Sequence, residues 1–320
     1  MFGKNIKYII SEIRNNYHDT YWWRMRFQNR IVGPIQESLE EDPGIDVMAR
    51  DWDNLLVLDA CRSDLFEATI DLDKFDAYEV VRSQASATPE WMEENFAGET
   101  FGDTVYVSGN PWVSKIAPDA FHDIVNIWLE DFDIEQEELA EVEVLNELGM
   151  TFGETVPAER VNEAALEAAE QYPDKRLIVH YFQPHAPFVG NPDGSRKDAV
   201  PDIHPGRPLA AGEIEREEVW SLYRENLEYV WHHAETLTEE LGGKSVVTSD
   251  HGEMFGERLS PFPIRGYAHP IGLRSPELVD VPWAEIQHGD RRSITNDGVR
   301  TVAVEEDVVD DRLRDLGYKV

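Results

Sequence analysis

The sequence has little cysteine and no long apolar run, and each shortage excludes a class of protein. Cys61 is the only cysteine among 320 residues, so the chain cannot form an internal disulfide. No run approaches the roughly 18 apolar residues of a membrane-spanning helix. The N-terminus also lacks the apolar core and small-residue cleavage site of a secretory signal. We therefore expect a cytoplasmic protein.

Basic residues are scarce as well. Lysine and arginine number 29 against 64 acidic residues, which gives a net charge of −35, and only eight of the 29 are lysine. Such a charge destabilises a compact chain by self-repulsion unless salt screens it, and the Debye length falls to about 3 Å at 1 M salt. We interpret the composition as adaptation to molar salt in the cell of a halophilic organism. The alternative is an acidic surface that binds cationic partners, and either interpretation argues against nucleic acid.

Residues 1–32 depart from this acidity, with six basic residues against two acidic ones. Isoleucines recur at helical spacing over 6–13, and Trp22, Trp23 and Phe27 follow among arginines. A basic amphipathic helix of this kind binds anionic membrane surfaces, here the inner face of the cell membrane. The alternative is a helical arm that packs on the acidic body of its own chain or of a second copy in a homo-oligomer. We divide the chain into an arm, 1–50, and an α/β domain, 51–320.

The rest of the chain alternates between strand and helix patterns, which predicts an α/β fold: a largely parallel sheet with helices on both faces. Bound ligands lie beyond the carboxyl ends of the strands in such sheets. The apolar runs that predict strands are 54–60, 78–83, 104–108, 176–182 and 244–249, and the helical patterns cover 157–172, 213–241 and 305–318.

Acidic and histidine side chains follow three of these strands. Asp59 ends the first, His185 follows the run 176–182, and the pair Asp250-His251 follows the run 244–249, with His269 shortly afterwards. Each residue alone has an ordinary role, such as a turn or a helix cap. Together at one edge of a parallel sheet, they predict a site for a divalent metal ion: manganese, zinc, magnesium or calcium.

The same residues lie in motifs that resemble a known family. The run Val-Thr-Ser-Asp-His-Gly-Glu, 247–253, resembles the signature of sulfatases, and Pro-His-Ala-Pro-Phe, 184–188, resembles their Pro-His-x-Pro segment. The run Leu-Asp-Ala, 58–60, stands where the first metal-binding strand ends. The resemblance covers roughly 52–290 and is to the alkaline phosphatase and sulfatase superfamily; the acidic composition suggests a sulfatase-like protein of haloarchaeal type.

The resemblance implies an alkaline phosphatase-like core and a role for each residue. Asp59, Asp250 and His251 would bind the metal, His185 would contact the anionic or leaving group, and His269 would bind substrate or a second metal. Arg62 either binds an oxyanion or forms a salt bridge on the surface. The implied activity is metal-dependent hydrolysis or transfer of phosphate or sulfate esters. The substrate would be an anionic small molecule, a glycan or a lipid-linked ester.

The sequence departs from the sulfatases at the nucleophile. Their Cys-x-Pro-x-Arg motif is missing, and Cys61 lies too close to Asp59 to replace it, so we interpret it as a packing residue. In the corresponding region, 83–91, the hydroxyls of Thr88 and Ser86 remain, and Thr88 begins a predicted helix, where backbone amides favour an anion. A hydroxyl nucleophile favours phosphoester chemistry. The alternative is that both residues only cap the helix in a non-catalytic sulfatase-fold protein that binds metal or an anionic glycan.

Overall fold

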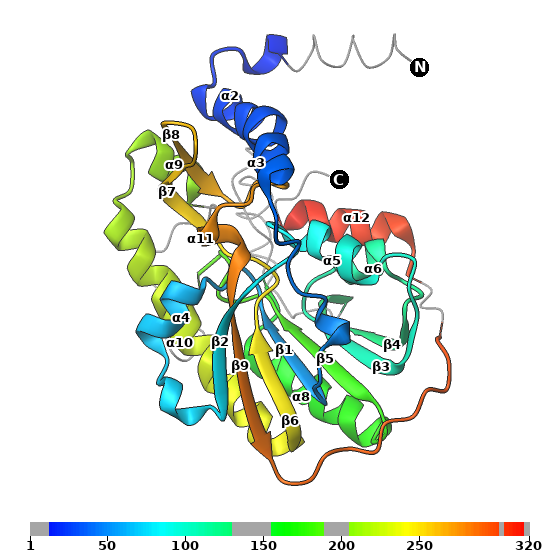
Figure 1. Cartoon of the computed structure of the whole chain (residues 1–320). Helices are drawn as coiled ribbons and strands as arrows, with labels where there is room; N and C mark the ends of the chain where they lie inside the picture. Colours follow the sequence, from blue (N-terminus) through cyan, green and yellow to red (C-terminus); the bar gives the residue numbers. More distant parts are fainter. Residues whose placement is uncertain (1–12, 130–154, 189–204, 301–303, 317–320) are drawn as a thin grey trace, which may run out of the picture.

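The computed structural model describes residues 13–129, 155–188, 205–300 and 304–316 (Figure 1). Its centre is a seven-stranded sheet in the order β2-β9-β6-β1-β5-β3-β4. Only β9 runs antiparallel to its neighbours, β2 and β6. The predicted largely parallel sheet is therefore confirmed. The strands are β1 Asn54–Leu58, β2 Ala77–Arg82, β3 Phe101–Ser108, β4 Phe121–Asn126, β5 Arg176–Tyr181, β6 Gly243–Thr248 and β9 Asp280–His288.

Helices cover both faces of the sheet, as the sequence predicts (Figure 1). One face carries α4 Ser63–Thr69, α8 Ala158–Gln171 and α10 Arg216–Leu241, and the other carries α5 Thr88–Phe96, α6 Trp112–Ile116 and α12 Glu306–Asp315. Shorter elements connect them: η2 Val47–Ala49, η3 Leu72–Lys74, η4 Ile127–Leu129, α9 Gly206–Ala211 and α11 Pro276–Val279.

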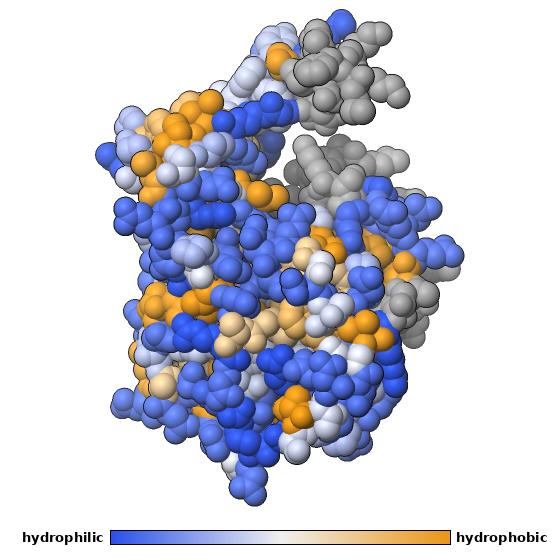
Figure 2. Space-filling view, turned by 45° about the vertical axis from the view of Figure 1, so that its right-hand side comes forward, coloured by the Kyte–Doolittle hydropathy of each residue, from blue (hydrophilic) through white to orange (hydrophobic). Residues whose placement is uncertain are grey.

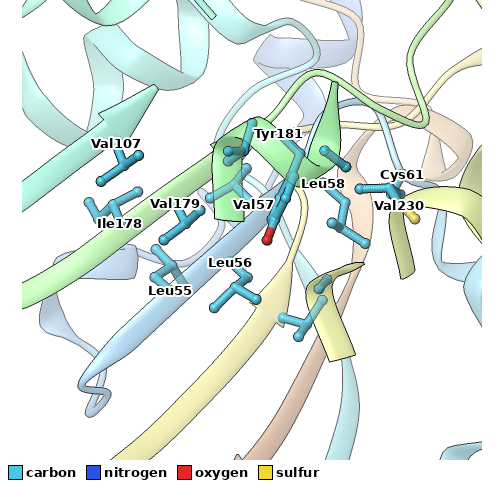
Figure 3. Close-up of a cluster of buried hydrophobic side chains, with 14 of the residues drawn as sticks. Leu55, Leu56, Val57, Leu58, Cys61, Val107, Ile178, Val179, Tyr181 and Val230 are labelled. Carbon is cyan, nitrogen blue, oxygen red and sulfur yellow. The ribbon is translucent and has the colours of Figure 1, made fainter. Parts of the chain in front are cut away.

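The core is densest around β1, the central strand. All five of its residues are buried, because helices cover both of its faces. Leu55, Leu58 and their neighbours on β3 and β5 interlock across the sheet (Figure 3). Cys61 is fully buried in the same cluster, so it packs as the sequence predicts.

The described part of the N-terminal arm is a continuous helical rod made of α2 Thr20–Phe27, the π-helical η1 Gln28–Val32 and α3 Gly33–Leu39. It lies at the upper end of the molecule beside a two-stranded sheet of β7 Met254–Leu259 and β8 Ile264–Ala268 (Figure 1). The Gln28 side chain donates to Arg265 O at 3.0 Å, and Gln36 donates to Ser260 O at 2.8 Å. The arm thus packs on its own chain; residues 1–12 of the predicted helix lie outside the described residues.

No helix within 13–129, 155–188, 205–300 or 304–316 combines the length and apolarity that crossing a bilayer requires.

Candidate metal-binding and catalytic site

Three of the predicted site residues meet at the carboxyl ends of adjacent strands. Asp59 follows β1, Asp250 and His251 follow β6, and all three side chains are fully buried. His251 Nε2 lies 3.7 Å from Asp59 Oδ1 and 3.4 Å from Asp250 Oδ2. The parallel pairing of β1 with β6 produces this meeting, since it brings both strand ends to one edge.

Backbone and amide donors hold the two carboxylates in place. Asp250 Oδ1 accepts from the backbone N–H groups of Ala60, at 3.0 Å, and of His251, at 2.9 Å. Ala60 adopts a left-handed conformation, with φ of 58°, which is strained for a residue with a Cβ. Asn110, just beyond β3, donates to Asp59 Oδ2 at 2.8 Å. The strained turn therefore aims an N–H at Asp250.

The donor set fits a divalent cation. His251 Nδ1 lies 2.7 Å from Gly252 O, so this nitrogen carries the proton and Nε2 turns its lone pair toward the carboxylates. Asp59 Oδ1 has no hydrogen-bond partner among the described residues. Ligand atoms about 2 Å from one ion stand about 3–4 Å from each other, as these do. Two buried carboxylates also require a compensating positive charge.

The electrostatics of the two carboxyl groups differ. Burial, together with the charge of Asp250, raises the pKa of Asp59 well above its ordinary value. Burial also acts to raise the pKa of Asp250, but the imidazoles of His251 and His180 and the N–H of Ala60 outweigh it and lower that pKa. Asp250 is thus the better stabilised anion of the pair in the absence of a cation.

Of the two candidate nucleophiles, only Thr88 contacts this group. Its Oγ1 donates to Asp250 Oδ2 at 2.8 Å and lies 3.2 Å from His251 Nε2. Thr88 is the first residue of α5, so its hydroxyl stands beside the free amides of a helix N-terminus. Ser86 instead donates to Pro270 O at 2.9 Å and to Glu90 Oε2 at 3.0 Å.

A second group of potential ligands lies next to the first. His185, Glu253 and His269 have ligand atoms within 4.8 Å of one another. His269 Nδ1 lies 2.7 Å from Glu253 Oε2, and the rings of His269 and His251 are 4.7 Å apart. Ala268, just before His269, is the second non-glycine residue with a positive φ in the described part of the chain, 61°. The backbone is therefore strained beside both groups.

This second group borders a small pocket. His185 and Glu253 share its lining with apolar side chains, namely those of Ala186, Phe188, Pro205, Tyr223 and Phe255. The pocket combines ionisable and aromatic side chains, which is typical of a site for a ligand with a charged and an apolar part.

Sequence reasoning missed three polar residues of the site. His180, on β5, is fully buried, with Nε2 3.9 Å from Asp59 Oδ2 and 4.0 Å from Asp250 Oδ2. Tyr106 OH lies 2.7 Å from Nδ1 of His180. Burial lowers the pKa of His180 to about 4, so the imidazole of His180 is neutral. His180 interrupts an apolar strand, Asn110 follows the strand end of β3, and Glu253 closes the Asp-His-Gly-Glu run. Each of these signals is visible in the sequence.

Arg62 is held in salt bridges with acidic side chains outside the candidate site. Its guanidinium is buried and paired with Glu257 Oε1 and with Asp64 Oδ2, each at 2.7 Å. It also donates to Glu253 O at 3.0 Å and stacks on Trp220. Arg62 thus forms salt bridges, as the second alternative expects, but it is buried and does not lie on the surface. Arg62 supports the segment that carries Glu253.

Comparison with known proteins gives structural likenesses only. No family model and no curated protein matches the chain. The soluble domain of lipooligosaccharide phosphoethanolamine transferase A from Neisseria meningitidis superposes with a TM-score of 0.45 and 15% identity, over 72% of this chain and 75% of that one. The zinc complex of the periplasmic domain of EcEptC from Escherichia coli gives 0.43 and 13%, over 77% and 75%.

A third likeness names a superfamily. A protein in the alkaline phosphatase superfamily from Vibrio parahaemolyticus superposes with a TM-score of 0.38 and 11% identity, over 84% of this chain and 69% of that one. The structural neighbours thus include the superfamily that the sequence motifs resemble. At such low identity and overlap they assign no activity to this chain.

Proposed function

We propose that this protein is a metal-dependent enzyme that hydrolyses or transfers a phosphate or sulfate ester, with Thr88 as the nucleophile. Asp59, Asp250 and His251 would hold one divalent cation. Bound there, the cation would supply positive charge that stabilises the anion of the reacting group. The missing sulfatase cysteine favours a phosphate ester over a sulfate ester.

One observation carries the proposal. The hydroxyl of Thr88 lies 2.8 Å from Asp250 Oδ2 at a helix N-terminus, beside two buried carboxylates and an imidazole. A hydroxyl that serves only as a helix cap bonds to the amides of its own helix. Thr88 instead bonds to a carboxylate 162 residues away in the chain. That contact suits a hydroxyl that is held and deprotonated for attack.

The chain's own residues would perform the following chemistry. Asp250 accepts the hydrogen bond of Thr88 and orients Oγ1 toward the reacting phosphorus or sulfur. A bond forms from Oγ1 to that atom as the hydroxyl proton passes to Asp250, and the ester bond to the leaving oxygen breaks. The second group, with His269 hydrogen-bonded to Glu253, is suited to give the leaving oxygen a proton. Water or an acceptor hydroxyl then releases Thr88.

His185 and His269 would also contact the anionic part of the substrate. Both lie beside the cation group, since their rings are 5.0 Å apart and the ring of His269 is 4.7 Å from that of His251. A second cation among His185, Glu253 and His269 is the other use of this group, because their ligand atoms are close enough to share one ion. Titration of the metal content per chain separates the two uses: one ion or two.

Substitution of Asp250 tests the proposal. We expect Asp250→Asn to abolish turnover of aryl phosphate, phosphodiester and sulfate esters in high salt, and to weaken binding of the cation at least tenfold. Asp119→Asn, on an exposed loop far along the chain, is the matched control and should keep both. Retained turnover in the Asp250 variant would refute the assignment. A wild-type protein that binds metal but turns over none of these esters would instead support the non-catalytic alternative.

A further inference from the structure

The arm carries a stripe of exposed apolar side chains. Of twelve large hydrophobic side chains that are exposed in the described residues, seven belong to residues 13–39, which make up about a tenth of that part of the chain. Five of these seven recur at every fourth residue, and we call them the apolar stripe: Trp23, Phe27, Ile31, Ile35 and Leu39. Isolated exposed apolar residues are ordinary, but a contiguous set marks an interaction surface.

The helical geometry keeps the stripe on one side of the rod. An α-helix has about 3.6 residues per turn, so a spacing of four would drift around the axis. The π-helical turn η1 lies in the middle of the stripe and holds more residues per turn, which offsets that drift. Meanwhile Gln28, Val32 and Gly33 are buried against the body of the molecule. The arm therefore has one face that packs on its own chain and another that presents apolar side chains outward.

Charge distinguishes this surface from the rest of the molecule. The described arm carries Arg14, Arg24, Arg26 and Arg30 against Asp19 and Glu37 over residues 13–39, in a chain with a net charge of −35. Arg14 and Arg30 are exposed and form no ion pair with the described residues. Figure 2 shows hydrophobic side chains at the upper end of the molecule, where the arm and β7–β8 lie. Apolar and basic side chains together complement an anionic lipid surface.

The arm is also attached to the rim of the candidate site. Its buried face contacts the β7–β8 sheet, whose ends carry Glu253 and His269. Arg24 lies over the ring of Tyr267, 5.0 Å from its centroid, two residues before His269. Asp19 caps α2 and pairs with Arg207 of α9 at 2.8 Å. A surface that binds the stripe would therefore lie close to the second group of the site.

We propose that the arm docks the protein on an anionic lipid bilayer surface through the apolar stripe and its arginines, and that the ester it acts on is linked to a lipid of that surface. The second half of this statement rests on the proposed function; the first half does not. Burial of the apolar stripe among lipid chains does not depend on ionic screening. Docking should therefore persist in molar salt, where the arginine contribution is screened.

Vesicle flotation with the full-length protein tests the docking. We expect wild-type protein to bind phosphatidylglycerol vesicles at both 0.15 M and 2 M KCl. Replacing the five stripe residues by serine should lower the bound fraction at least tenfold at both salt concentrations. The matched control replaces Val80, Leu129 and Val308 by serine, since these side chains are equally exposed (43–45%) but lie outside the arm. It should bind like the wild type, and circular dichroism confirms that each variant is folded.

A second variant tests the docking without removing a packing contact of the arm. It is needed because Phe27 of the stripe also packs on Phe262, with ring centroids 5.7 Å apart. Arg14→Gln with Arg30→Gln changes only exposed side chains. It should weaken binding to phosphatidylglycerol vesicles several-fold at 0.15 M KCl and have little effect at 2 M. The Asp250→Asn protein should bind vesicles like the wild type, which separates failure of docking from failure of the proposed activity.

The substrate half has its own measurement. The ratio of turnover of a phosphodiester lipid in vesicles to turnover of the same head group in water should fall at least tenfold in the stripe variant. Equal binding of wild-type and stripe variant to vesicles would overturn the proposal. The proposal would also be overturned if the wild-type protein bound no vesicles and the stripe variant differed from it in oligomeric mass, since the stripe would then be a contact between copies of the chain.

Discussion

Two hydroxyls separated by one residue have quite different surroundings. Thr88 contacts Asp250 and His251, whereas Ser86 is bonded to Glu90 and Pro270. The sequence places Thr88 at the start of a predicted helix and Ser86 two residues before it, but it does not show which of the two hydroxyls reaches Asp250. The distinction comes from which residue occupies the first helical position, and this depends on the packing of α5 against the sheet.

This difference gives a prediction with an internal control. Thr88→Ala should lower kcat at least a thousandfold, because it removes the nucleophile. Thr88→Ser should keep a measurable part of the activity. Ser86→Ala should cost about 1 kcal/mol of stability through its lost hydrogen bonds, with kcat within a fewfold of wild type. Steady-state kinetics with one phosphoester decide the matter, and a Ser86 variant with the larger kcat defect would reverse the assignment.

Gly252, between His251 and Glu253, permits a close approach of another backbone segment, that of Glu277. A Cβ at this position would stand 2.2 Å from the carbonyl oxygen of Glu277, so α11 must move to admit any side chain. We expect Gly252→Ala to destabilise the fold by about 2–4 kcal/mol and to weaken metal binding. Gly109→Ala is the control, since a Cβ there meets no atom closer than 3.4 Å. Equal melting temperatures for the two variants would contradict the prediction.

At the scale of elements, the sequence predicts the strands that carry the site better than it predicts the other strands. β1, β5 and β6 are buried on both faces, so their sequences are nearly continuous apolar runs that end in the polar residues of the site. β4 was missed because its half-buried pattern is interrupted by His122 and Asp123. The β7–β8 sheet was missed because charged residues and glycines interrupt its apolar pattern, namely Gly256, Glu257, Arg258, Arg265 and Gly266.

β9 was missed for a physical reason that its register explains. Proline is unfavourable inside a central strand, and β9 contains Pro282. The pairing of β6 with β9 ends at Thr248 and Trp283, so Pro282 lies one residue beyond it and faces only β2. The missing N–H therefore does not interrupt the ladder to β6. Composition alone argues against a strand here, whereas the observed register leaves Pro282 outside the pairing with β6.

The first turn of α5 is held by one carboxylate, Glu90. Its Oε2 accepts from the backbone N of Ser86 at 2.8 Å, and its Oε1 pairs with Arg274 at 2.8 Å. Burial acts to raise its pKa, but Arg274 and the Ser86 N–H outweigh that effect and lower it. Because the folded pKa is depressed, the stabilisation is present above the unfolded pKa and is lost as pH falls through the folded pKa.

A pH-dependent stability measurement checks this. Glu90→Gln should lower the free energy of unfolding by about 1.5–3 kcal/mol at pH 7, the range for hydrogen bonds to charged groups. The difference from wild type should shrink as the pH falls below the ordinary value of 4.5 for Glu90. Glu93→Gln, exposed on the same helix, is the control and should change stability little at any pH. A difference that does not depend on pH would show that Glu90 acts through packing alone.

At the scale of the whole molecule, the net negative charge determines how stability depends on salt. The net charge of −35 is spread over a surface on which many acidic side chains are exposed. The melting temperature should therefore rise between 0.1 M and 2 M KCl, because the Debye length falls from about 10 Å to less than 3 Å. Differential scanning calorimetry measures this, and 2 M of an uncharged osmolyte separates screening from solute exclusion. A melting temperature that is the same at both salt concentrations would contradict the adaptation to salt.

The complete burial of Asp59 and Asp250 also has a kinetic consequence. Neither carboxylate touches solvent, so an ion between them can leave only when the surrounding structure opens. The exchange rate is then set by the frequency of that opening rather than by affinity. Such an ion would survive dialysis and purification. The metal content of an isolated sample would then show which metal the chain bound in the cell that produced it.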